Sequence, residues 1–111
     1  MVEYQSDRLD RIYGALSDVH RRRMLQRLAR GTLTISELAS PLPMSLAAAS
    51  KHVQMLERAG LVHRERVGRE HHITLVEKPL TDAADWALKT VAFWERRLDQ
   101  LDDYLNEGSK R

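Results

Sequence analysis

The chain has 111 residues, of which 42% are hydrophobic, 31% charged and only 5% aromatic. This length is typical of one domain with a single aliphatic core, and it is too short for a two-domain enzyme with a cleft between its domains. The chain contains no cysteine, which excludes disulfides, zinc ribbons, thiolate metal sensors and cysteine nucleophiles.

The sequence predicts a soluble, cytoplasmic protein that does not bind membranes. The N-terminal segment is polar and lacks the apolar core of a signal peptide. Apolar runs elsewhere fall short of the roughly 18–20 residues that a membrane-spanning helix needs.

Residues 5–30 are expected to form two helices. The second helix is predicted to begin at Asp18, a favourable N-cap residue, and to stop at Gly31. The first helix has one apolar face, made of Leu9, Ile12, Tyr13 and Leu16.

Residues 34–59 are expected to form a helix-turn-helix. Thr34 and Glu37 have the spacing of a capping box at the start of a short helix, which two prolines end within about two turns. Ser45 starts the next helix and Gly60 closes it. One side of that helix is apolar through Ala49, Val53 and Leu56.

A β-hairpin is predicted over residues 61–76, because two segments rich in β-branched residues flank Gly68. One long helix without proline or glycine is predicted over residues 80–107. The expected fold class is mainly α with a small β-hairpin, a winged helix-turn-helix forming a single domain over residues 1–111. The second helix of such a motif normally enters the DNA major groove.

Charge is distributed unevenly along the chain. The net charge of +2 combines +6 in residues 20–76 with −4 elsewhere, and all five histidines lie in the basic segment. This asymmetry is typical of a module that binds a polyanion through one part of its surface.

The second helix of the helix-turn-helix is the candidate recognition helix. Ser50 and Gln54 can bond base edges or phosphates, Lys51 can reach a phosphate or a guanine, and small alanines allow close approach to the groove. For His52, a phosphate contact and a structural hydrogen bond are both open. The residues predicted to contact DNA are Ser45, Leu46, Ala47, Ser50, Lys51, His52 and Gln54.

Further contacts to DNA are predicted from the hairpin. Arg64, Arg66 and Arg69 surround its turn and suit phosphates or the minor groove, where arginine is favoured. Arg21 and Arg22 are predicted to contact the DNA backbone as well.

The long helix carries an a/d seam of apolar residues at alternating spacings of four and three. A small domain cannot cover such a length, so a partner helix is expected, with an intramolecular bundle as the alternative. The predicted dimer interface comprises Leu9, Ile12, Tyr13, Leu16, Ala87, Val91, Trp94, Leu98, Leu101 and Leu105.

Several of these runs resemble the ArsR-type winged helix-turn-helix transcriptional regulators. The run ALSDVHRRRML at residues 15–25 is similar to their ALADPTRRAIL opening, and SELA at 36–39 to their ELA turn entry. SLAAASKHVQMLERAGLV at 45–62 resembles S-x-x-A-V-S-x-H-L-x-x-L-x-x-A-G-L-V. The tail FWERRLDQLDDYL at 93–105 is similar to the ending of a cysteine-free branch.

The resemblance implies a prokaryotic homodimer that binds an inverted-repeat operator in double-stranded DNA, usually as a repressor. The Cys-x-Cys metal site of some relatives is absent, since residues 37–40 read ELAS, and neither a metal nor a cofactor is expected. The sequence departs from the pattern at Leu46 and Ala47, where many relatives carry polar residues. DNA shape and the hairpin over residues 61–76, which is the wing of this fold, are therefore expected to carry more of the specificity.

Other functions are weighed against this one. An enzyme is not expected, because the sequence lacks a Gly-rich phosphate loop, a G-x-S-x-G elbow and an H-E-x-x-H motif. The alternatives are a winged-helix protein-interaction module, and a repressor that responds to a metal or another unknown effector through a non-cysteine site.

Overall fold

The computed structural model describes residues 2–109, and its side chains from residue 6 to residue 108. The two ends of the predicted domain, residues 1 and 111, lie outside the described part. The chain divides at Thr81 into two compact units. Its elements are α1 (Val2–Leu16), α2 (Val19–Leu28), β1 (Leu33–Thr34), α3 (Ile35–Ala39), α4 (Leu46–Arg58), β2 (Val62–Val67), β3 (Glu70–Leu75) and α5 (Lys78–Ser109).

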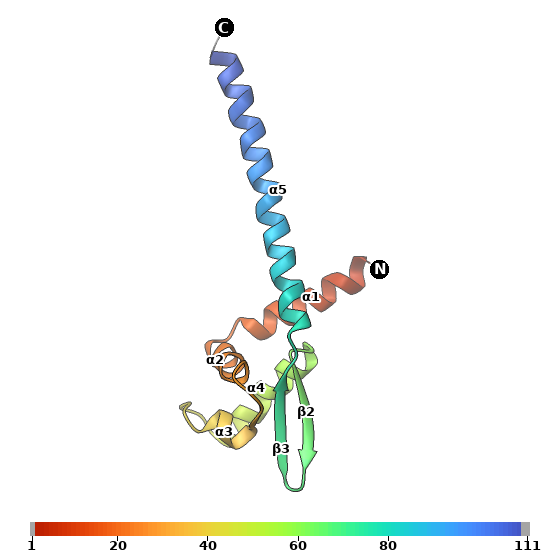
Figure 1. Ribbon diagram of the computed structural model, residues 1–111, viewed down its shortest axis with the longest axis vertical. Helices are drawn as coiled ribbons and strands as arrows, with labels where there is room; N and C mark the ends of the chain where they lie inside the picture. Colours follow the sequence, from red (N-terminus) through yellow and green to blue (C-terminus); the bar gives the residue numbers. More distant parts are fainter. Residues whose placement is uncertain (1, 110–111) are drawn as a thin grey trace. The chain divides into compact units, whose positions relative to one another are not determined.

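The first unit has the winged helix-turn-helix architecture that the sequence predicts. Figure 1 shows β2 and β3 as a long hairpin beside α2, α3 and α4. The core of this unit is aliphatic and draws on every helix from α1 to α4, on the residue before β2 and on β3. Its largest fully buried side chains are Ile12, Met24, Leu38, Val53, Leu56, Leu61 and Ile73.

Local signals in the sequence set the starts of the helices. The Asp18 carboxylate accepts hydrogen bonds from the backbone N–H groups of His20 and Arg21 at the start of α2. Thr34 and Glu37 form the expected capping box at α3, and Ser45 caps α4 by accepting from the N–H of Ala48. These bonds satisfy backbone donors that the first turn of a helix leaves without partners.

The sheet has one strand more than the predicted hairpin. β3 pairs antiparallel with β2 on one side and with the two-residue β1 on the other, where Leu33 lies opposite Ile73 and Thr34 opposite His72. Two residues are too few to show an alternating pattern, so β1 could not be predicted from the sequence. Its pairing attaches the start of α3 to the base of the wing.

Several helix boundaries differ from the expected ones. α1 begins at Val2 rather than at residue 5, and α5 ends at Ser109 rather than at residue 107. α2 ends at Leu28 with Ala29 as its C-cap, so Gly31 lies in the following loop with φ of 150°. α5 begins at Lys78, two residues before the predicted start, and includes Pro79. Proline is tolerated in the first helical turn, where its missing N–H would have had no partner in the helix.

One residue of the predicted dimer interface belongs to the core instead. Ile12 has no exposed surface, so it has nothing to offer a partner subunit. Of the four apolar residues of α1, Ile12 is fully buried, Leu9 and Leu16 are half-buried and Tyr13 is exposed. The apolar periodicity did not distinguish a core within the protomer from an interface.

We expect opposite effects from alanine at two glycines. Gly60 has φ of 73°, a left-handed conformation that costs a side-chain-bearing residue about 1–2 kcal/mol, so Gly60→Ala should lower the free energy of unfolding by about that amount. Gly14 lies within α1, and a Cβ there meets no atom within 4 Å. Gly14→Ala should therefore stabilise the protein by about 0.5–1 kcal/mol. Urea unfolding followed by circular dichroism measures the free energy of unfolding of both variants. If both substitutions changed it in the same direction, the conformations assigned to Gly60 and Gly14 would be contradicted.

Candidate nucleic-acid interface

α4 buries one side and exposes the other. Ala49, Val53 and Leu56 are fully buried. The opposite side of the helix therefore faces outward and carries most of the residues predicted to contact DNA. Among these, Ser45, Leu46, Ala47, Lys51 and Gln54 are exposed, and Ser50 is half-buried.

The wing ends in a two-residue turn of Gly68 and Arg69. Gly68 has φ of 65°, and Val67 pairs with Glu70 across the turn. Glycine at the first of two loop residues is typical of the type II′ turn, whose twist matches that of paired strands. Arg66 donates from Nε to the Gly68 carbonyl at 3.1 Å, and both Arg66 and Arg69 are exposed.

Arg64 connects the wing to α4. Its Nε and Nη2 lie 3.1 Å and 2.9 Å from Oε1 of Glu57, so two N–H groups of the guanidinium bond a single carboxylate oxygen. The sequence prediction placed Arg64 on DNA and gave Glu57 no role. A three-residue connection between α4 and β2 is the signal that would have suggested this pair, because it keeps the two side chains close.

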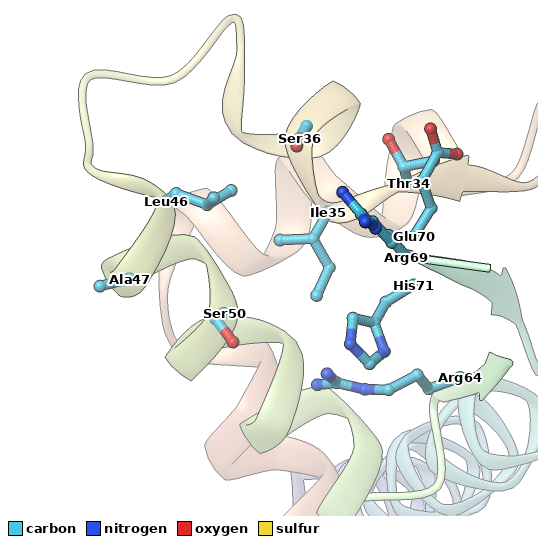
Figure 2. A pocket seen from close by; sticks show the side chains of 10 residues that line it. All are labelled: Thr34, Ile35, Ser36, Leu46, Ala47, Ser50, Arg64, Arg69, Glu70 and His71. Atoms are coloured by element: carbon cyan, nitrogen blue, oxygen red, sulfur yellow. The ribbon is translucent and has the colours of Figure 1, made fainter. Parts of the chain in front are cut away.

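An open groove of about 520 Å³ lies between α4 and the wing, next to the start of α3. Figure 2 shows Leu46, Ala47 and Ser50 along α4 on one side, and Arg64, Arg69 and His71 on the other. The structure thus brings predicted residues of the recognition helix and the wing to one site. The sequence prediction missed the remaining lining residues, Thr34, Ile35, Ser36, Glu70 and His71.

Arg21 holds α1, α2 and α4 together. Its Nε donates to the Ala15 carbonyl at 2.7 Å, its Nη2 to the Gly14 carbonyl at 3.2 Å, and its Nη1 lies 3.1 Å from Nδ1 of His52. A guanidinium only donates, so Nδ1 of His52 accepts and the ring proton lies on Nε2. Of the two alternatives for His52, the structure therefore contains the structural hydrogen bond.

Each of the three guanidinium nitrogens of Arg21 is bonded inside the fold, and its contact with the DNA backbone stays a prediction. The neighbouring Arg22 is exposed. It donates to the Leu16 carbonyl at 2.8 Å through Nη1, so its contact with the DNA backbone stays a prediction.

The predicted seam on α5 is exposed within the chain. Val91, Trp94, Leu98, Leu101 and Leu105 each keep 53–60% of their surface accessible. Ala87 is half-buried. On α1, Leu9 and Leu16 are half-buried and Tyr13 is 37% exposed. Apart from Ile12, the residues proposed for the interface therefore retain surface for a partner.

No group of three or more His, Cys, Asp or Glu side chains within the described residues is placed to hold a metal ion. In the same part of the chain, no helix is both long enough and apolar enough to cross a membrane.

Comparison with known proteins gives matches to regulators. A family model described as a helix-turn-helix domain matches residues 16–65, from the end of α1 to the middle of β2. The HTH-type transcriptional regulator Rv2034 of Mycobacterium tuberculosis is 47% identical over 62 residues, which are 56% of this chain and 56% of that protein. The match thus spans about half the length of that relative.

The transcriptional repressor SdpR of Bacillus subtilis is 26% identical over 83 residues, covering 75% of this chain and 92% of that protein. The crystal structure of the ArsR family transcriptional regulator RHA00566 is 36% identical, with a TM-score of 0.77 over 81% of this chain and 93% of that chain. The chain belongs to the ArsR family.

The ArsR family consists of transcriptional regulators and not of enzymes. This agrees with the sequence analysis, which did not predict an enzyme. In this member of the family, residues 37–40 of α3 and its C-cap contain no cysteine. A thiolate metal site is therefore impossible at this short helix.

The cap of α2 makes a pH-dependent contribution to stability. Partial burial raises the pKa of Asp18, but hydrogen bonds from the backbone N–H groups of Arg21 and His20 outweigh it and hold the pKa below its ordinary value of 3.8. A carboxylate with a lowered pKa stabilises the fold above its unfolded pKa, and this contribution is lost as the pH falls through the folded pKa.

We therefore expect Asp18→Asn to be less stable than the wild type by about 0.3–1 kcal/mol at neutral pH, because asparagine keeps a capping oxygen but loses the charge. The difference should shrink steadily below about pH 4. Urea titrations between pH 2 and pH 7 measure it, and a difference independent of pH would contradict the account.

Proposed function

We propose that the chain is a cytoplasmic, homodimeric transcriptional repressor that binds an inverted-repeat operator in double-stranded DNA. The observation that carries this proposal is the position of the exposed face of α4 and the arginine-tipped wing on the two sides of one groove. A recognition helix in the major groove and a basic wing on the flanking backbone would then engage the duplex together.

Dimerisation is supported by α5. Five large apolar side chains at a/d spacing stay more than half exposed along this helix, and a stripe of this kind on a long helix is normally covered by another helix. A two-fold symmetric dimer would present two copies of α4 to successive major grooves, about 34 Å apart. An inverted repeat matches that symmetry.

Repression is supported by the relative from Bacillus subtilis, which is named a transcriptional repressor. A dimer seated on an operator excludes other proteins from the same stretch of DNA. This mechanism requires only tight binding and no catalytic group.

A winged-helix protein-interaction module is the second candidate. The observation in its favour is Leu46, which keeps 56% of its surface exposed on the outward side of α4. The two functions differ in their dependence on charge, because DNA binding releases counterions from phosphates and falls steeply with salt.

Fluorescence anisotropy with duplexes from the DNA flanking the gene tests the proposal. Lys51→Ala, Arg66→Ala and Arg69→Ala should each weaken binding and lower the slope of log affinity against log salt concentration by about one. Arg30→Ala is the matched control, since Arg30 is exposed in the turn after α2 and does not line the groove. Salt-independent binding, or unchanged affinity in all three variants, would favour the interaction module.

The dimer is tested at Leu98, which is 60% exposed, so that a charge there should not unfold the protomer. Leu98→Glu should be a monomer by light scattering and should bind the inverted repeat at least about tenfold more weakly, because two half-sites would no longer be engaged by one particle. Gln100→Glu adds the same charge off the seam and should remain dimeric. A dimeric Leu98→Glu protein would refute the α5 interface.

A further inference from the structure

The first turn of α4 exposes apolar side chains where a DNA-reading helix normally carries polar ones. Leu46 is the first residue of this helix, and 56% of its surface is exposed. Ala47 beside it is exposed as well. Neither residue belongs to the buried side of α4, which is formed by Ala49, Val53 and Leu56.

The side chains of this turn have little hydrogen-bonding capacity. The Oγ of Ser45 already accepts the N–H of Ala48 at 3.1 Å as the helix cap. The polar side chains Ser50, Lys51 and Gln54 follow only from the second turn onward. The leading end of the helix therefore presents mainly methyl groups.

The surroundings of this apolar turn carry a small excess of positive charge. Arg64, Arg69 and Lys51 stand against Glu70, which also lines the groove, and Glu57, which pairs with Arg64. Leu46, Ala47 and Ser50 line the groove that Arg64 and Arg69 line from the wing (Figure 2). Lys51 is exposed one turn along α4. Phosphates would be held around the apolar turn, whereas an apolar protein partner would have to cover or pair these charges. The charge distribution therefore favours DNA as the occupant.

Among the base edges of the major groove, the C5-methyl of thymine is the one apolar group. We infer that Leu46, with Ala47, reads thymine by contact with this methyl group, and that specificity at the leading end of α4 depends on the methyl rather than on a hydrogen bond. This inference rests on the proposed DNA binding and adds the chemical feature that the helix recognises.

The test exploits deoxyuridine, which pairs like thymidine and lacks only the methyl group. A duplex sequence is first selected from a pool of random DNA with the wild-type protein. Each thymine of the selected duplex is then replaced singly by deoxyuridine, and the affinity is measured by anisotropy. At one or two thymines in each half-site, binding should weaken about fourfold for each methyl removed.

Leu46→Ala assigns the effect to the side chain. In this variant the same deoxyuridine replacement should have little further effect, because the leucine that contacts the methyl is gone. Met55→Ala is the matched control, since Met55 is an apolar residue of α4, 41% exposed, that does not line the groove. It should retain the full response to deoxyuridine. Circular dichroism of both variants verifies their helix content.

The outcomes separate the two claims. If the protein binds duplex DNA in a salt-dependent manner but no single deoxyuridine weakens binding, or if Leu46→Ala keeps the full response, the methyl readout is wrong and the proposed function stands. If the wild-type protein enriches no sequence and binds no duplex, the proposed function itself fails, and the methyl readout fails with it.

Discussion

The short connection between α4 and β2 is the constraint on which the candidate interface depends. Gly60, with φ of 73°, donates to the Glu57 carbonyl, and the N–H of Leu61 donates to the Leu56 carbonyl at 2.9 Å. These two bonds form a Schellman motif, which ends the helix and reverses the chain within a few residues. Leu61 is fully buried, and its carbonyl accepts the N–H of Val76 at 2.8 Å. One buried residue thus fixes the end of α4 together with the bases of both wing strands.

The ion pair between Arg64 and Glu57 crosses this same connection. Both side chains are partly exposed, at 21% and 36%, and pairs of this kind contribute about 1 kcal/mol or less to stability. The effect of this pair on geometry is greater than its effect on stability, because it ties the first half of β2 to the last turn of α4. In the proposed complex, α4 and the wing would approach DNA as one surface, which would limit the entropy lost on binding. The α5 helix carries seven acidic and four basic residues, so in this proposal DNA binding and dimerisation would use different parts of the chain.

Features set by neighbouring residues could be predicted from the sequence. The caps at Asp18, Thr34 and Ser45, the stop at Gly60 and the buried side of α4 all follow from spacings of four residues or fewer. Features that depend on contacts between residues far apart in the sequence could not be predicted. Arg21 and His52 are 31 positions apart, and no local pattern distinguishes an arginine that binds backbone carbonyls from one that faces a phosphate. The same applies to Ile12, whose apolar spacing fits a core and an interface equally well, and to β1, whose two residues pair only because β3 lies beside them.

Hydroxyl-radical footprinting of the wild-type protein on its selected duplex tests the central claim most directly, because it reports where two copies of α4 and the wing meet the DNA backbone. The account predicts two protected blocks on one face of the duplex, related by two-fold symmetry and centred about 10 base pairs, or one helical turn, apart. A single protected block, or two blocks in direct rather than inverted orientation, would contradict a two-fold dimer that reads DNA through α4 and the wing.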